Sequence, residues 1–65
     1  MADLNELSAQ EIGRRLKLSR ENAAIRQADA AQDVGLSRPT LVAIEKGERR
    51  IRMEELQALA RLYGV

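Results

Sequence analysis

The residues that could do chemistry in this sequence gather between positions 26 and 47, in the stretch RQADAAQDVGLSRPTLVAIEKG. Two short helical patterns lie there on either side of a turn at residues 35–37. Gln27 opens the first pattern, and the second leaves Arg38, Thr40 and Lys46 on its outer side or beside it. Amide, hydroxyl and cationic groups bind phosphate oxygens and base edges. Because the major groove of DNA admits a helix held out from a protein surface, this arrangement predicts contact with DNA.

The turn and the helix ends have the residue types that this geometry needs. Ala31 and Val34 lie on a narrow apolar face of the first helix, which is expected at 27–34. Gly35 can take the left-handed conformation that ends a helix. Ser37 is a suitable N-cap for the second helix, expected at 38–46, and Leu41 and Ile44 would face inward. The candidate contact residues of this second helix and its cap are Ser37, Arg38, Pro39, Thr40, Val42, Ala43 and Lys46.

The remaining pattern predicts two more helices and no strand. Ser8 and Glu11 have the spacing of a capping box and begin a helix that runs to about residue 22. A last helix is expected at 53–63, ended by Gly64. We expect residues 1–7 to be a flexible lead and residues 8–65 to be one compact, all-α, four-helix domain. The inward-facing residues expected on these two helices are Ile12, Leu16, Ser19, Ala23, Met53, Leu56, Leu59, Ala60 and Tyr63, with Ile51 as an anchor between 48 and 52.

Composition excludes several classes of function. The chain has 65 residues, no cysteine and no histidine, so a disulfide scaffold and the common zinc sites are excluded. No apolar run reaches membrane-spanning length and no secretion signal opens the chain, so we expect a cytoplasmic protein that does not contact membranes. No nucleophile–base pair, carboxylate set or glycine-rich phosphate loop is present. We expect neither a cofactor nor enzyme activity.

The distribution of charge tells more than the net charge of +1. Residues 1–13 contain acidic side chains and no base, whereas basic residues gather in the first helix and around the segment 38–52. A local basic patch is what phosphate contact requires, and an ordinary solvated charged face is the alternative. The basic residues concerned are Arg14, Arg15, Lys17, Arg20, Arg38, Lys46, Arg49, Arg50 and Arg52.

The segment resembles the helix-turn-helix of the lambda-repressor and Cro-like (XRE) family of bacterial and phage DNA-binding domains. The matching residues are Gln27, Ala31, Val34, Gly35, Ser37, Leu41, Ile44, Glu45 and Gly47. The stretches IGRRLKLSREN and MEELQALARLYGV resemble the first and fourth helices of that family, so the resemblance covers about residues 12–65. It implies a truncated version of a five-helix fold, and a transcriptional regulator that binds double-stranded DNA as a homodimer.

The resemblance also implies roles for individual residues. Gln27 would contact the DNA backbone, although a plain helix-start residue is the alternative. Val42 and Ala43 would pack on thymine methyl groups or bind a protein, since neither makes a polar base contact. Lys46 has an alternative role as a partner of the helix dipole. The recognition face would consist of Arg38, Pro39, Thr40, Val42 and Ala43, and the phosphate clamps of Lys46, Arg49 and Arg50.

Arg20 and Glu45 occupy family positions that form a largely buried salt bridge between the first and third helices. Two departures from the family pattern stand nearby. The first is the turn before the second helix, where the family usually has glycine near Ala24 and a capping residue near Arg26. The second is Ala30, where the family commonly has a larger apolar residue.

The family usually continues into a fifth helix after the position of Leu62, Tyr63 and Val65, which makes these residues candidates for self-association or for a junction to a C-terminal domain. The stretch SRPTLVAIEKGER also resembles the module that precedes ImmA/IrrE-type metallopeptidase domains. The alternative function is therefore a protein-interaction or antitoxin-like module that regulates a fused or separate metallopeptidase or toxin.

Overall fold

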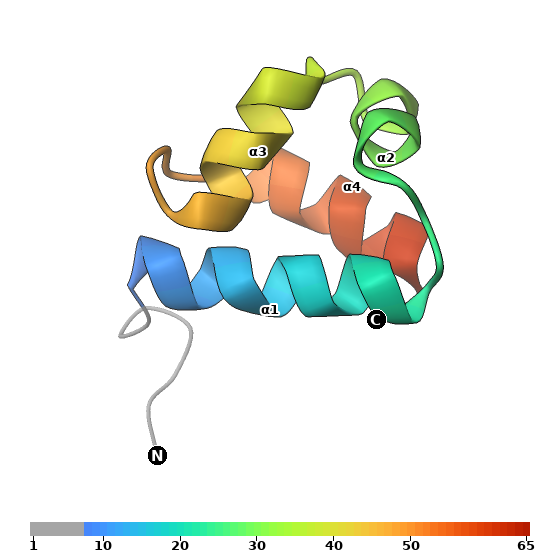
Figure 1. Cartoon of the computed structure of the whole chain (residues 1–65), viewed down its shortest axis with the longest axis horizontal. Helices are drawn as coiled ribbons and strands as arrows, with labels where there is room; N and C mark the ends of the chain where they lie inside the picture. The colour runs from blue at the N-terminus through green and yellow to red at the C-terminus, as the bar shows by residue number, and fades with distance from the viewer. Residues whose placement is uncertain (1–7) are drawn as a thin grey trace.

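A computed structural model describes residues 8–65 of the chain, which form four helices and no strand. They are α1 (Ala9–Asn22), α2 (Gln27–Asp33), α3 (Arg38–Lys46) and α4 (Met53–Tyr63). Figure 1 shows α1 along one long side of the molecule, with α2 and α3 above it and α4 behind. The predicted all-α, four-helix architecture is confirmed, while the lead predicted at 1–7 lies outside the described residues. None of the described helices has the length and apolar character needed to cross a bilayer.

The helix ends follow local chemistry. Ser8 Oγ accepts a hydrogen bond from the Glu11 backbone at 3.1 Å, and Gly47 and Gly64 end α3 and α4 with φ of 77° and 76°. The reciprocal half of the predicted capping box was wrong. The Glu11 carboxylate instead accepts hydrogen bonds from Arg14 (2.7 and 3.2 Å) and Arg15 (3.1 Å), which lowers its pKa to about 2.

The connection between α1 and α2 contains the first of the two departures noted in the sequence, at Ala24 and Arg26. Ala24 has φ of 58°, which places an alanine in the left-handed conformation that glycine adopts more easily. Arg26 is the N-cap of α2 and its side chain makes no capping hydrogen bond. The helix α2 ends at Asp33, one residue earlier than predicted, and Val34 forms its cap.

The core lies between the four helices, with α1 and α2 packed against α3 and α4 packed against α1 and α2. Leu41, Ile44 and Leu59 are its largest fully buried side chains. Two small residues, Ala30 and Ala31, are buried beside them on α2, which brings α2 close to α3. Other core side chains, some only partly buried, are Ile12, Leu16, Ala23, Ile25, Val34, Leu36, Ile51, Leu56, Leu62 and Tyr63.

Two predictions about exposure were wrong at the ends of α4. Met53 was expected to face inward but is 58% exposed, because it is the first residue of α4 and the buried residues of this helix, Leu59 and Tyr63, lie in its second half. Tyr63 is buried in the core, which confirms its predicted inward position but contradicts its proposed part in a self-association surface. Leu62 is half-buried and packs against that core, whereas Val65 is exposed.

A close approach of α1 to α3 fixes how α3 sits on the rest of the domain. Gly13 is buried against the α3 backbone, and a Cβ at this position would contact Ile44 O and lie 2.6 Å from Glu45 O. Only glycine fits such a crossing without displacing one of the helices. The predicted inner face of α1 omitted both Gly13 and Arg20, which are buried on this helix.

Candidate nucleic-acid interface

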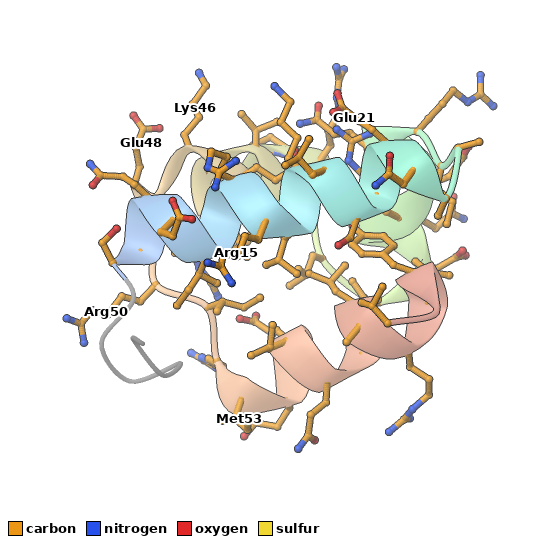
Figure 2. The ribbon with its side chains drawn as sticks, turned by 90° about the horizontal axis from the view of Figure 1, so that it is seen from below. Arg15, Glu21, Lys46, Glu48, Arg50 and Met53 are labelled. Carbon is orange, nitrogen blue, oxygen red and sulfur yellow. The ribbon has the colours of Figure 1, made fainter. Side chains whose placement is uncertain are left out.

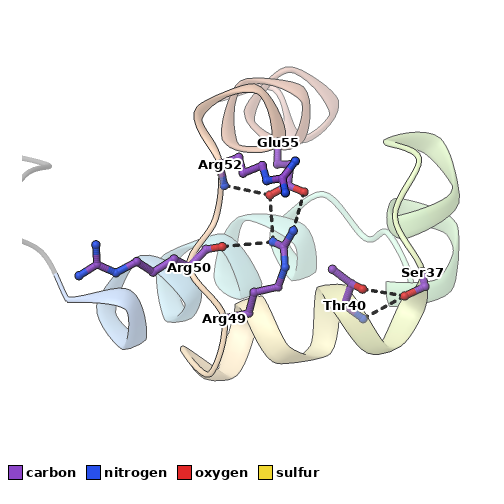
Figure 3. Close-up of polar contacts among 6 residues, drawn as sticks. All are labelled: Ser37, Thr40, Arg49, Arg50, Arg52 and Glu55. Atoms are coloured by element: carbon purple, nitrogen blue, oxygen red, sulfur yellow. Dashed lines mark hydrogen bonds and ion pairs between the residues drawn. The ribbon is translucent and has the colours of Figure 1, made fainter.

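The turn between α2 and α3 is built from backbone and cap bonds. Gly35 has φ of 76°, and the Leu36 N–H donates to Ala31 O at 2.8 Å. Ser37 then caps α3, since its Oγ accepts from the Thr40 N–H at 3.2 Å. The same Oγ lies 2.8 Å from Thr40 Oγ1, and Figure 3 shows the two side chains together at the start of α3. These bonds set the direction in which α3 leaves the turn.

The helix α3 has two sides of different character. Its inner side buries Leu41, Ile44 and Glu45 against the other helices. The outer side carries six of the residues that the sequence singled out, together with the cap residue Ser37. Of these, Ser37, Arg38, Pro39 and Lys46 are exposed, and Thr40, Val42 and Ala43 are half-buried. The structure therefore brings these candidates together on one helix and its cap.

A shallow depression of 340 Å³ lies along this outer side. Pro39, Val42 and Ala43 supply apolar lining, and Arg38 and Glu48 supply one charge of each sign. Glu48 was not among the sequence candidates, because it follows α3 in the chain and only the turn of the backbone at Gly47 brings it beside the helix. Figure 2 shows Lys46 and Glu48 projecting on the side of the molecule opposite Met53 of α4.

A second depression, of 550 Å³, lies between the beginnings of α2 and α3. Arg38 borders both depressions and is therefore the cation at the centre of this surface. Arg26 pairs with Asp29 across the rim, with Nε 3.0 Å from Oδ2, and both side chains are exposed. The second depression is lined by Arg20, Arg26, Gln27, Ala28, Asp29 and Arg38.

Gln27 is held at the inner edge of the second depression. Its Nε2 donates to Glu45 Oε1 at 2.8 Å, so the side chain is anchored to α3. An amide nitrogen carries two N–H groups, and this bond uses one of them. Gln27, for which the family resemblance implies contact with the DNA backbone, is thus tied directly to α3, the helix that carries most of the other candidates.

Arg20 and Glu45 meet in the interior between α1 and α3. Arg20 Nε lies 2.8 Å from Glu45 Oε2 and Nη2 lies 3.3 Å from Oε1, with side chains 9% and 3% exposed. The hydrogen bonds to Glu45 raise the pKa of Arg20. A further bond, from Arg20 Nη1 to Ile25 O at 2.9 Å, fastens the connection between α1 and α2. This cluster joins three of the four helices behind the outer side of α3.

Among the three candidate phosphate clamps, Arg49 differs from the other two. Lys46 and Arg50 are exposed, whereas Arg49 forms a two-point ion pair with Glu55 of α4, at 2.9 and 3.0 Å. Figure 3 shows the Arg49 side chain turned toward α4 and the Arg50 side chain directed away from that pair. The pair raises the pKa of Arg49 and lowers the pKa of Glu55. Glu55 was not among the sequence candidates, because only the fold of the loop between α3 and α4 brings it beside Arg49.

Similarity to known proteins identifies the family of this domain. Within residues 8–65 no group of three acidic side chains is placed to hold a metal ion. No curated protein matches the chain at a significant level. The family model described as a helix-turn-helix domain matches residues 11–65, which contain α2, α3, α4 and most of α1. The chain therefore belongs to the helix-turn-helix domain family.

Proposed function

We propose that this domain binds double-stranded DNA with sequence selectivity and regulates transcription, in the manner of the lambda-repressor and Cro-like regulators. Membership of the helix-turn-helix family supports DNA binding and a regulatory role. The observation that carries the proposal is the division of α3 into a buried inner side and an outer side that presents Arg38, Thr40 and Lys46. A helix anchored in this way can enter the major groove without losing its packing.

The outer side of α3 supplies the groups for reading bases. Arg38 donates two parallel hydrogen bonds, a geometry that matches guanine O6 and N7. Val42 and Ala43 form the apolar lining of the first depression, where a thymine methyl group finds van der Waals contact. The hydroxyl of Thr40 donates to a base edge or to a phosphate oxygen. With so few polar groups facing the groove, DNA shape contributes part of the selectivity.

Positioning on the duplex comes from groups at the edges of α3. Lys46 and Arg50 are exposed cations that neutralise phosphates on the strand beside the end of α3. Gln27 keeps one amide N–H after bonding to Glu45 and donates it to a phosphate near the start of α2. Contacts of this kind fix the register of the helix without reading sequence.

A domain this small covers few base pairs, so we propose that two copies bind a near-palindromic site. Helix-turn-helix dimers bind half-sites separated by about one turn of the duplex. The end of α4, with Val65 exposed and Leu62 half-buried, provides apolar surface for such pairing. Selection of bound duplexes from a random pool tests this point, since inverted repeats with constant spacing are expected.

A salt titration of binding to the selected duplex tests the function itself. Arg38→Ala should weaken binding by about tenfold or more and relax selection at one base position. Arg61→Ala is the matched control, because Arg61 is an exposed arginine of α4 that lines neither depression. Absence of wild-type binding to any duplex at low salt would overturn the proposal.

A second function is favoured by one observation, the apolar lining of the depression at Val42 and Ala43. Such a surface also suits a protein partner, as in an antitoxin-like module that controls a metallopeptidase or a toxin. The double variant Arg38→Ala, Lys46→Ala separates the two functions, since it removes DNA retention and leaves the apolar lining intact. Regulation that survives this change would make the protein partner the primary target.

A further inference from the structure

The loop between α3 and α4 carries three arginines, Arg49, Arg50 and Arg52. Of these three, only Arg49 forms an ion pair within the described residues, with Glu55. Arg49 donates through Nη1 and Nη2 to the two carboxylate oxygens of Glu55, at 2.9 and 3.0 Å. Arg50 and Arg52 are exposed. Three cations that lie close together in the sequence therefore differ in how readily they can meet an external anion.

Glu55 is itself held firmly in place. Its Oε1 also accepts the Arg52 backbone N–H at 2.9 Å, and its side chain is 14% exposed. Arg49 Nη1 makes a further bond to Arg50 O at 3.2 Å, so the pair also shapes the loop (Figure 3). A carboxylate and a phosphate bind the guanidinium fork in the same two-point geometry. Glu55 thus occupies the donors that a DNA phosphate would need.

We propose that Glu55 is an internal counterion that withholds Arg49 from DNA phosphates and so lowers the number of phosphates that the domain neutralises. This inference rests on the proposed DNA binding. In this arrangement Lys46 and Arg50 make the phosphate contacts at the end of α3, and Arg49 fixes the loop that carries Arg50. Glu55 reduces the sequence-independent part of the affinity and leaves base reading on α3 unchanged.

The position of Arg49 makes this restraint effective. Its neighbours Glu48 and Arg50 are both exposed, and a third of the Arg49 side chain is already accessible. In the proposed arrangement, a guanidinium released from Glu55 becomes available to a DNA phosphate. Each additional phosphate contact steepens the dependence of log K on log salt by about 0.9.

The salt dependence of binding to a non-specific duplex tests the proposal with Glu55→Gln. The expected slope is steeper than that of the wild type by about 0.9, with tighter binding at low salt. Glu54→Gln is the matched control, because Glu54 is an exposed neighbour on α4 that forms no ion pair within residues 8–65 and its replacement changes the net charge equally. A Glu55→Gln slope equal to that of Glu54→Gln would overturn the inference while leaving DNA binding established.

The double variant Arg49→Gln, Glu55→Gln removes both partners and leaves no uncompensated charge, so it provides a test even if Glu55→Gln alone fails to fold. If Arg49 makes no phosphate contact in the wild type, the double variant keeps the wild-type slope. A slope shallower by about 0.9 would show that Arg49 contacts phosphate in spite of Glu55 and would refute the inference. If the wild type binds no duplex at low salt, the proposed function fails first, and this inference fails with it.

Discussion

Arg20 of α1 and Glu45 of α3 form a two-point ion pair inside the domain, with 2.8 Å between Nε and Oε2 and side chains that are nearly inaccessible to solvent. Glu45 also accepts from Gln27 at 2.8 Å, so one carboxylate joins α1, α2 and α3. An acidic residue on the helix proposed to bind DNA is thereby explained, because it faces the interior and not the groove. The pair links the stability of the fold to the direction in which α3 projects.

Arg20→Ala is expected to destabilise the domain by about 3 kcal/mol, because it leaves the Glu45 carboxylate buried without its main partner. For a domain of this size the melting temperature should fall by roughly 12 °C or more. Arg26→Ala is the control, since its pair with Asp29 is at the surface and should contribute less than about 1 kcal/mol. Equal melting temperatures for the two variants would contradict the structural role of Arg20.

Gly13→Ala gives a prediction in which two effects have opposite signs. Helix propensity alone would make alanine more stable by about 1 kcal/mol in the middle of α1. The added Cβ, however, would contact Ile44 O and lie 2.6 Å from Glu45 O, so we expect a net destabilisation of about 1–3 kcal/mol. Denaturant unfolding followed by circular dichroism measures the sign, and a stabilised variant would show that α1 and α3 are farther apart than described.

Ala24→Gly should stabilise the domain. The left-handed conformation at φ 58° costs an alanine about 1–2 kcal/mol, and glycine removes this strain. The larger entropy of the unfolded glycine chain offsets part of the gain, which leaves about 0.5–1 kcal/mol. Ala58→Gly in the middle of α4 should instead destabilise by about 1 kcal/mol, so opposite shifts in melting temperature are expected from the same substitution.

Tyr63→Phe probes a buried hydroxyl that has no hydrogen-bond partner among residues 8–65. Burial raises the pKa of Tyr63 to about 12, above its ordinary value of 10. A raised pKa favours the protonated form in the folded state, so this contribution to stability is complete below pH 10 and is lost as the pH rises from 10 toward 12. The variant should be as stable as the wild type at neutral pH.

The difference in unfolding free energy between wild type and Tyr63→Phe should therefore shift in favour of phenylalanine between pH 10 and 12. Other groups that titrate in this range contribute equally to both proteins and cancel in the comparison. A difference that does not change with pH would indicate that the hydroxyl is accessible to water.

The parts of the fold that the sequence predicted well are those set by local chemistry. Ser37 and Gly47 act on backbone groups within a few residues of themselves, so their roles as caps follow from residue type and spacing. The apolar spacing of Leu41 and Ile44 likewise identifies the inner side of α3.

The features that the sequence did not predict depend on contacts between distant segments. The close approach at Gly13 depends on where the α3 backbone lies, and no local signal distinguishes this glycine from one that merely weakens a helix. The pairing of Arg49 with Glu55 depends on how the loop returns across α4, so charge alone assigned Arg49 to phosphate contact. Arg20 was identified through the family resemblance and not through periodicity.

Val42 offers a direct test of base reading by the apolar depression. In the duplex that the domain selects, replacement of thymine by deoxyuridine at a contacted position removes one methyl group. Loss of that contact should weaken binding about fourfold, given about 0.8 kcal/mol for burial of such a group. Val42→Ala removes the side chain that would contact the methyl group, so the thymine and deoxyuridine duplexes should bind this variant almost equally. Deoxyuridine at a position outside the contacted step serves as the control. If Val42→Ala keeps the full preference for thymine, the methyl group packs elsewhere and Val42 does not take part in base reading.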